Sequence, residues 1–361
     1  MKILLTIARI FVGVLFIFSG LVKANDPLGL SYKMEEYFEV WNLFFLNDYS
    51  LAFALVMNVF EIVAGIAVLL GWRMKLFSWL LLLLIIFFTF LTGYAAFSGK
   101  IAACGCFGDC IPLTPIQSFW KDVILLVLII FLLINHKKIK QVVSSKLAIS
   151  ILTISTLLVS VFQWYVLTHL PVVDCLPYKK GNDLLEQMKT PDGFIPDQYS
   201  FVFVYEKDGK QYEFPEDNLP DSVLEDEAYI YKERKDKLVK KGNGLKANIT
   251  DFNLVTPSGT DSTQAILSQP NKYILIFANS LDASAAKNYD VEFWRDLQKK
   301  LPVYVVTSAP LYFEGIPVLK ADGTVIKTAA RVDPTYFVMQ GSRVLGKFSY
   351  ARTEQMMELL N

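Results

Sequence analysis

The sequence predicts an all-α membrane helical bundle with five spans, followed by a soluble α/β domain with a strand-rich connecting segment. Hydrophobic residues make up 53% of the 361 residues, and the mean hydropathy of +0.37 is too high for one ordinary soluble globule. This apolar excess lies before about residue 168, and the later residues have normal globular polarity. The change in composition therefore predicts the main domain boundary.

Five apolar runs approach the roughly 20 residues that a helix needs to cross a bilayer. The runs are 3–22, 51–70, 76–97, 119–134 and 147–167. Lys and Arg gather in the loops on one side of such a five-span path, including Arg73, Lys75, Lys137 and Lys146. Because cytoplasmic loops are enriched in these residues, we expect a bacterial inner-membrane protein with a cytoplasmic N-terminus and a periplasmic C-terminal domain.

Charged residues inside the predicted spans are candidates for function, because a charge is costly in the bilayer. Glu61 lies near the middle of the second run, and Arg9 enters the first. We expect a structural ion pair between them or a neutral, hydrogen-bonded Glu61, and both remain candidates for a quinone or proton role. Lys121 and Asp122 are predicted to cap the fourth span at the interface. Lys+Arg and Asp+Glu both number 35, so the chain has no net charge that would attract nucleic acid, and we expect none as a partner. The apolar runs instead make the lipid bilayer the expected partner.

Three of the four cysteines crowd into the loop after the third span, which suggests a site more than a disulfide framework. These are Cys104, Cys106 and Cys110, and the fourth, Cys175, follows the fifth span. Disulfide exchange needs sulfurs that approach each other, with a thiolate as nucleophile, and exported thiols tend to be oxidised. We therefore predict all four as catalytic thiols, with Cys175 as a relay to the loop.

Two other interpretations of the cysteine loop stay open. One is a static disulfide that pins the loop. The other is zinc bound by the three thiolates with Asp109 or His169. The chain has no second paired motif and only 2 histidines, so we expect no metal.

Several motifs in the membrane half resemble those of the DoxX/MauE superfamily. They are Phe16-Ile-Phe-Ser19-Gly20-Leu-Val-Lys23, Asn58-x-x-Glu61-x-x-x-Gly65 and Cys104-Gly-Cys106-Phe107-Gly108. With Asp26-Pro27-Leu28-Gly29 and the long soluble tail, the chain is similar to the "DoxX family" proteins of Bacteroidetes. The resemblance covers roughly residues 1–140 and implies a four-helix core similar to the vitamin K epoxide reductase and DsbB type. Those proteins pass electrons between exported thiols and a membrane quinone, so quinone is the cofactor implied, and the sequence contains no nucleotide, haem or flavin motif.

The soluble half divides into two segments. Residues 171–247 are strand-rich, and Asp208-Gly209 predicts a hairpin turn between 199–206 and 211–214. Residues 248–361 resemble a thioredoxin-type unit, with strands at 273–278, 302–307, 335–339 and 343–348, a closing helix at 356–360 and a cis bond before Pro334.

This thioredoxin-like domain lacks Cys-x-x-Cys, because 279–284 reads Asn-Ser-Leu-Asp-Ala-Ser and no cysteine follows Cys175. We therefore expect it to dock or recognise an extracytoplasmic protein partner. The predicted domains are a four-helix membrane domain at 1–140, a fifth span at 141–170, a strand-rich segment at 171–247 and the thioredoxin-like domain at 248–361.

These observations together favour an inner-membrane thiol–disulfide redox protein that exchanges electrons between its outer-face cysteines and a partner protein, with membrane quinone as the carrier. The alternative is a non-enzymatic membrane scaffold whose thioredoxin-like domain binds an exported partner. A further alternative is a quinone-oxidoreductase subunit with its chemistry on another chain.

Overall fold

The computed structural model describes residues 2–101, 105, 107–278 and 287–360. Its contacts divide the chain into two compact units. The first contains Met1–Asp183 together with Asn253–Asn361, and the second contains Leu184–Phe252. The first unit carries both the membrane helices and the C-terminal α/β part, so contacts between these two are contacts within one unit.

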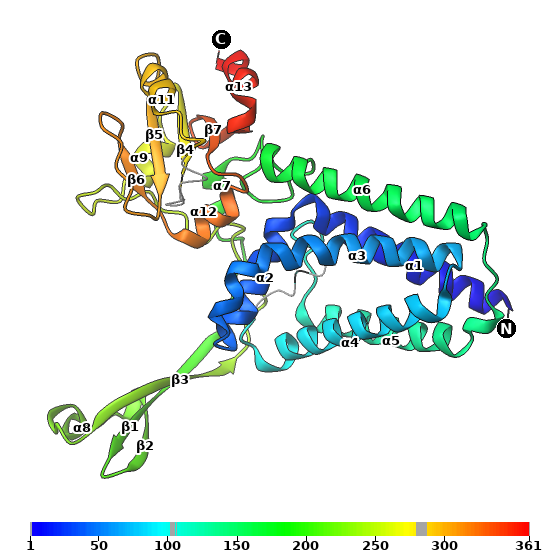
Figure 1. Cartoon of the computed structure of the whole chain (residues 1–361). Coiled ribbons are helices and arrows are strands. Elements are labelled where there is room, and N and C mark those ends of the chain that lie inside the picture. Colours follow the sequence, from blue (N-terminus) through cyan, green and yellow to red (C-terminus); the bar gives the residue numbers. More distant parts are fainter. Residues whose placement is uncertain (1, 102–104, 106, 279–286, 361) are drawn as a thin grey trace. The chain divides into compact units, whose positions relative to one another are not determined.

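Among the described residues, five long apolar helices form the N-terminal part, which confirms the five predicted spans (Figure 1). They are α1 (Lys2–Asn25), α3 (Ser50–Leu70), α4 (Met74–Ser98), α5 (Pro115–Ile134) and α6 (Ser145–His169), with the shorter α2 (Pro27–Val40), η1 (Phe44–Tyr49) and η2 (His136–Lys138) between them. Large apolar side chains such as Leu83 and Val127, each 61% exposed, cover the outside of the bundle. Such a surface is stable only against lipid, which supports a membrane location.

Glycines set the close packing of α1 against α3. A Cβ on Gly65 would lie 2.7 Å from the Gly13 carbonyl oxygen, and a Cβ on Gly20 would lie 3.2 Å from the Asn58 carbonyl oxygen. Small residues let two membrane helices approach this closely and gain van der Waals contact that lipid does not replace. The antiparallel register of the two helices follows from these two contacts.

The helix starts beside the loops follow from local capping. Asp26 accepts a hydrogen bond from the Gly29 amide, and Pro27 occupies the first position of α2. Thr114 and Gln117 form a capping box at the start of α5. These residues satisfy amide groups that would otherwise have no partner, so they fix where each helix begins.

The C-terminal part of the first unit is a five-stranded mixed sheet with strand order β6-β5-β4-β7-β8. The strands are β4 (Lys272–Phe277), β5 (Val303–Thr307), β6 (Val318–Lys320), β7 (Thr335–Gln340) and β8 (Arg343–Ser349). The helices among the described residues of this part are α9 (Thr263–Leu267), α11 (Val291–Gln298), α12 (Gly323–Ala329), η4 (Tyr350–Arg352) and α13 (Thr353–Leu360). β4, β5 and β6 are parallel, whereas β7 and β8 pair antiparallel, and the Asp333–Pro334 bond is cis as predicted.

The second unit is built on an antiparallel sheet with strand order β2-β1-β3. Its elements are α7 (Leu184–Met188), β1 (Gln198–Lys207), β2 (Lys210–Pro215), η3 (Glu216–Asn218), α8 (Asp221–Glu225) and β3 (Ile230–Lys240). The predicted hairpin is confirmed, because β1 pairs with β2 across Asp208 and Gly209, which both have positive φ. Positive φ at both central residues matches the turn to the strand twist.

Candidate functional site

A disulfide bond joins Cys110 to Cys175 at one end of the bundle. The two Cα atoms are 4.9 Å apart, although 65 residues separate them in the sequence. Cys110 lies in the loop before α5, and Cys175 follows the end of α6. The bond therefore connects the cysteine loop to the segment that leads into the soluble part. Cys110 is the loop cysteine that pairs with Cys175. Cys104 and Cys106 fall in the part of the loop that the structure does not describe.

The end of α1 holds the Cys175 side of this bond. The Asn25 side chain donates to the Val173 carbonyl at 2.8 Å and accepts from the Val173 amide at 3.0 Å. This two-way pairing, two residues before Cys175, fixes the backbone that presents the sulfur. His169, near Cys175 in sequence, instead stacks on Tyr165 with ring centroids 4.4 Å apart.

A buried ion pair between Lys23 and Glu61 lies in the same half of the bundle. The Lys23 side chain is 2% exposed and that of Glu61 is 0% exposed. The Lys23 ammonium also lies 4.9 Å from the centre of the Phe88 ring. A charge buried this deeply is retained only with a partner, so the pair explains why both residues are tolerated inside the bundle.

The predicted pairing of Arg9 with Glu61 is wrong. Arg9 Nη1 instead donates to the Lys140 carbonyl at 3.4 Å, at the opposite end of α1 from Lys23. The glycine contacts between α1 and α3 explain the error, because their register places Arg9 about two turns of α3, roughly 12 Å, away from Glu61. Spacing along the sequence did not reveal that register, and Lys23 takes the role expected of Arg9.

Polar side chains continue from this pair toward α6. Asn58, one turn before Glu61 on α3, donates to Gln163 on α6 at 3.0 Å, and neither side chain is more than 2% exposed. Asn58 Oδ1 and Glu61 Oε2 have no hydrogen-bond partner among the described residues. Buried polar atoms are normally hydrogen-bonded, so two such oxygens without partners mark this stretch as a candidate functional site.

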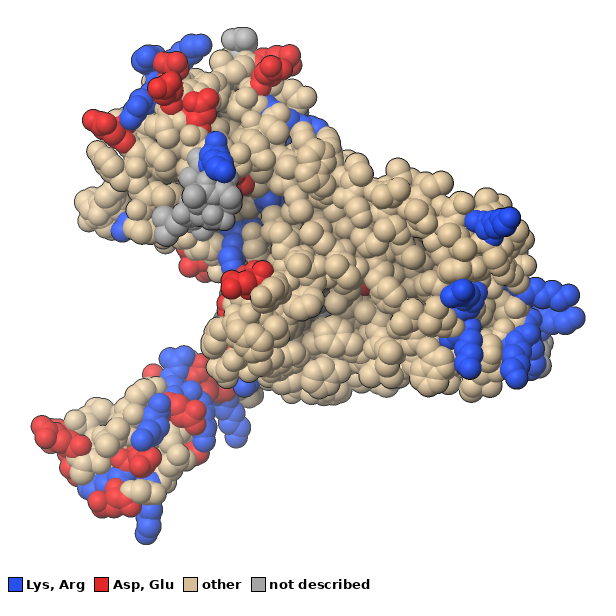
Figure 2. All heavy atoms as spheres, in the orientation of Figure 1, with Lys and Arg blue, Asp and Glu red and all other residues tan. Residues whose placement is uncertain are grey.

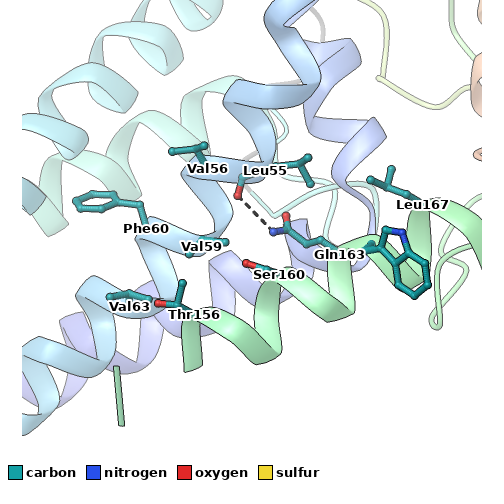
Figure 3. A pocket seen from close by; sticks show the side chains of 10 residues that line it. Leu55, Val56, Val59, Phe60, Val63, Thr156, Ser160, Gln163 and Leu167 are labelled. Carbon is teal, nitrogen blue, oxygen red and sulfur yellow. Dashed lines mark hydrogen bonds between the residues drawn. The ribbon is translucent and has the colours of Figure 1, made fainter. Parts of the chain in front are cut away.

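Two hollows flank these polar groups. A small cavity of about 30 Å³ lies beneath the cysteine loop, with Lys23, Lys33 and Gly105 in its lining. A larger groove of about 550 Å³ runs between α3 and α6 (Figure 3). Its lining is apolar except for Thr156, Ser160 and Gln163. The first hollow has room for little more than a water molecule, whereas the second has the size of a ligand site.

The expected interfacial role of Asp122 is also corrected. Asp122 is fully buried and accepts from Thr92 on α4 at 3.1 Å, and the Lys121 ammonium lies 2.8 Å from its other oxygen. Lys121 also lies 4.9 Å from the centre of the Phe107 ring in the cysteine loop. This carboxylate therefore joins α4 to α5 beneath the loop, and it is not a solvated helix cap.

Two of the ligands proposed for zinc, Cys110 and Asp109, have other partners in this structure, whereas Cys104 and Cys106 lie outside the described residues. The Cys110 sulfur is bonded to Cys175, and Asp109 Oδ2 accepts from Arg331 at 2.9 Å. Within the described residues, no group of three or more His, Cys, Asp or Glu is placed to hold a metal ion.

Sequence reasoning missed several polar residues of this region. Lys23 and Asn58 belong to the motifs quoted for the family resemblance. The motifs therefore marked both positions, but they did not show what either side chain contacts. Gln163 on α6 and Arg331 in the C-terminal part had no local signal, because their partners lie more than 100 residues away.

Comparison with known proteins finds matches to two segments of the chain, the membrane half and the strand-rich segment. Residues 1–135 match the family described as methylamine utilisation protein MauE, and residues 199–241 match a domain of unknown function, DUF8463. The chain is 30% identical over 127 residues to "Protein TlpB" of Flavobacterium psychrophilum. That alignment covers 34% of this chain and 35% of the relative, so the chain spans about a third of the relative's length. No solved structure matches.

Proposed function

We propose that this protein is a membrane thiol–disulfide redox protein in which the cysteine loop exchanges electrons with a partner protein. The observation that carries the proposal is the Cys110–Cys175 disulfide. It leaves the other two cysteines, Cys104 and Cys106, as a second potential pair only four to six residues before Cys110 in the sequence. Two pairs within reach of each other are what an exchange relay requires.

The exchange conserves atoms and electrons. The Cys106 thiolate attacks Cys110 Sγ, the Cys110–Cys175 bond breaks, and Cys175 leaves as a thiolate that takes up a proton. The Cys104 thiolate then attacks Cys106 Sγ, which gives a Cys104–Cys106 disulfide and a Cys110 thiol. Two electrons pass from one pair to the other, and the partner's dithiol or disulfide restores the starting state by the same chemistry.

We propose quinone as the carrier on the membrane side. The cavity beneath the loop is too small for a quinone ring, whereas the α3–α6 groove fits an isoprenoid chain in volume and polarity. Of the three polar residues in its lining, Gln163 and Ser160 would hold a ring carbonyl. When bound, a quinone would accept or return two electrons. Asn58 and Gln163 extend the polar side chains from this groove toward the buried Glu61–Lys23 pair.

The C-terminal part is proposed to be a thioredoxin-like module without its own thiols. The strand order β6-β5-β4-β7-β8 supports this proposal. Figure 2 shows Lys and Arg gathered at the end of the bundle that carries the α3–α4 and α5–α6 loops. That charge supports an orientation in the inner membrane with this end in the cytoplasm and the disulfide in the periplasm.

Thiol trapping in intact cells tests the redox role. Cells are quenched with acid, free thiols are alkylated with a mass-tagging maleimide, and the modified cysteines are counted with and without prior reduction. We expect the unsubstituted chain to show a mixture of reduced and bridged forms that changes with growth conditions. The variant Cys104→Ser removes the resolving thiol, so it should accumulate Cys106 in a mixed disulfide with Cys110 or with an exported protein.

The matched control is Ser98→Ala, which removes a hydroxyl at the end of α4, just before the cysteine loop, and should leave the pattern unchanged. A single fully oxidised species that resists mild reductant would refute the redox proposal. Full thiol–disulfide exchange with the partner protein when Cys104, Cys106 and Cys110 are all replaced by serine would also refute it. Either result would favour the scaffold, in which the disulfide is static and the C-terminal domain binds the partner.

A further inference from the structure

Each bridged cysteine directly follows an aspartate, and both aspartates are bound by the C-terminal part. Asp109 precedes Cys110, and Asp174 precedes Cys175. Arg331 Nη2 donates to Asp109 Oδ2 at 2.9 Å, and Lys347 Nζ donates to Asp174 Oδ2 at 2.8 Å. The two cations therefore hold the disulfide from both sides.

Arg331 is enclosed by its partners. It follows α12 and precedes the cis Asp333–Pro334 bond, and its side chain is 5% exposed. Besides Asp109, its Nε donates to both carboxylate oxygens of Asp26 at 3.0 and 2.8 Å. One guanidinium thus joins the cysteine loop to the end of α1, a geometry that its rigid fork of donors makes possible.

Lys347 lies on β8, and its side chain is 4% exposed. The neighbouring backbone is also tied to the Cys175 segment, because Gly181 N donates to the Val344 carbonyl at 2.8 Å and Val344 N donates to the Asn182 carbonyl at 2.9 Å. The Cys175 side of the disulfide therefore continues directly into the edge of the C-terminal sheet.

The electrostatics show that these cations depend on the aspartates. Burial lowers the pKa of Lys347, the Asp174 carboxylate opposes this shift, and the nearby positive charge of Arg331 adds to it. Burial also acts to lower the pKa of Arg331, but Asp26 and Asp109 together outweigh it, so that pKa is raised. Two neighbouring buried cations are tolerated because the carboxylates are held beside them.

We propose that the C-terminal domain is an in-chain docking partner that recognises the Cys110–Cys175 disulfide through Arg331 and Lys347. The bond holds Asp109 and Asp174 at the spacing that the two cations require. Docking therefore favours the oxidised form, and loss of the bond weakens docking by the same factor, as reciprocal coupling demands. The inference goes beyond the proposed function, because the coupling holds whether or not the loop cysteines carry out catalysis.

Redox titration of the full chain tests this coupling. The background carries Cys104→Ser and Cys106→Ser, so that the Cys110–Cys175 bond is measured alone. A dithiol reductant gives it two electrons and two protons, becomes a disulfide itself, and leaves two protein thiols that maleimide tagging counts. We expect Arg331→Gln to lower the ratio of reduced to oxidised dithiothreitol at half reduction by at least fivefold, and Lys347→Gln to act in the same direction.

Two comparisons assign the effect to the aspartate contacts. Lys299→Gln removes an exposed cation that pairs with Asp296 in the same domain, and it should leave the midpoint unchanged. Asp109→Asn combined with Arg331→Gln should shift the midpoint no further than the larger single change, because both changes remove the same Arg331–Asp109 contact. Midpoints unchanged in Arg331→Gln, or shifted equally by Lys299→Gln, would overturn the proposal.

A measurement without substitutions at the cations covers the case in which those variants do not fold. Hydrogen exchange of residues 323–349 is compared in the same background before and after reduction. We expect faster exchange around Arg331 and along β8 after reduction, whereas exchange in α11, away from the two cations, should stay unchanged. Equal exchange in both redox states would refute the coupling independently of the titration, and neither experiment requires electron transfer to a partner.

Discussion

Removing the Lys23 ammonium should strongly destabilise the membrane bundle. In Lys23→Met a side chain of similar length remains, but the Glu61 carboxylate is left fully buried without its cation. Glu61 Oε2 already lacks a hydrogen-bond partner among the described residues, so few neighbouring groups can compensate. Breaking a buried ion pair from one side costs about 3–5 kcal/mol. With roughly 2–4 °C per kcal/mol for a large domain, the melting temperature should fall by on the order of 10 °C.

A double-mutant cycle separates the ion pair from the loss of one residue. Replacing both charges, as Lys23→Met with Glu61→Leu, removes the desolvation cost together with the attraction, so the double variant should be more stable than Lys23→Met. Lys33→Met is the matched control, because Lys33 forms a half-buried pair with Glu36 on α2 and should lose at most about 1 kcal/mol.

The assay is thermal unfolding of the detergent-solubilised full chain, followed by the loss of helical circular dichroism. We expect a large loss for Lys23→Met, a small loss for Lys33→Met and partial recovery in the double variant. If Lys23→Met melts within the range of the Lys33→Met control, the buried pair contributes little to the stability of the bundle and the reasoning fails. A double variant less stable than either single variant would refute the desolvation argument.

Two further predictions concern packing and pH. Gly65→Ala should cost about 1–3 kcal/mol, because its new Cβ would meet the Gly13 carbonyl at 2.7 Å, and no loss of melting temperature would contradict the helix contact. Burial raises the pKa of Tyr336 to about 12. Its phenol therefore keeps its proton when folded and loses it more easily when unfolded, so the free energy of unfolding should be intact below pH 10 and fall by up to about 2–3 kcal/mol between pH 10 and 12. Tyr336→Phe should make that fall shallower but cost about 1–3 kcal/mol at neutral pH, because the buried Trp294 indole loses its acceptor, and an identical pH profile in a melting series would contradict the assignment.

The membrane half was largely predictable from the sequence because its signal is local. Each span is a continuous apolar run, and Pro27, Pro115 and their capping residues place the helix starts within a few residues. The hairpin at Asp208-Gly209 was predictable for the same reason, since a two-residue turn is specified by its own residues.

The candidate site was predictable only in its residue types. The cysteines were recognisable because they cluster in the sequence, and Glu61 because it lies within a span. The partner of Glu61, however, is set by the register of α1 on α3. That register rests on Gly13, Gly20 and Gly65, whose contacts form only in the packed bundle. The prediction that Glu61 meets Arg9 failed on this point, because α1 carries a cation toward each end, Arg9 and Lys23, and the sequence does not show which of them lies beside Glu61.

The sequence by itself determined five spans, their boundaries, the cysteine cluster and a C-terminal part without thiols. Each of these properties depends on neighbours within about 20 residues. Only the tertiary structure decided that Cys110 bonds Cys175, that Lys23 neutralises Glu61, and that Arg331 and Lys347 bind the aspartates beside the disulfide. Such contacts join residues 38 to 222 positions apart, and they form only where packed helices and strands bring buried charges together, because an unpaired buried charge is too costly to keep.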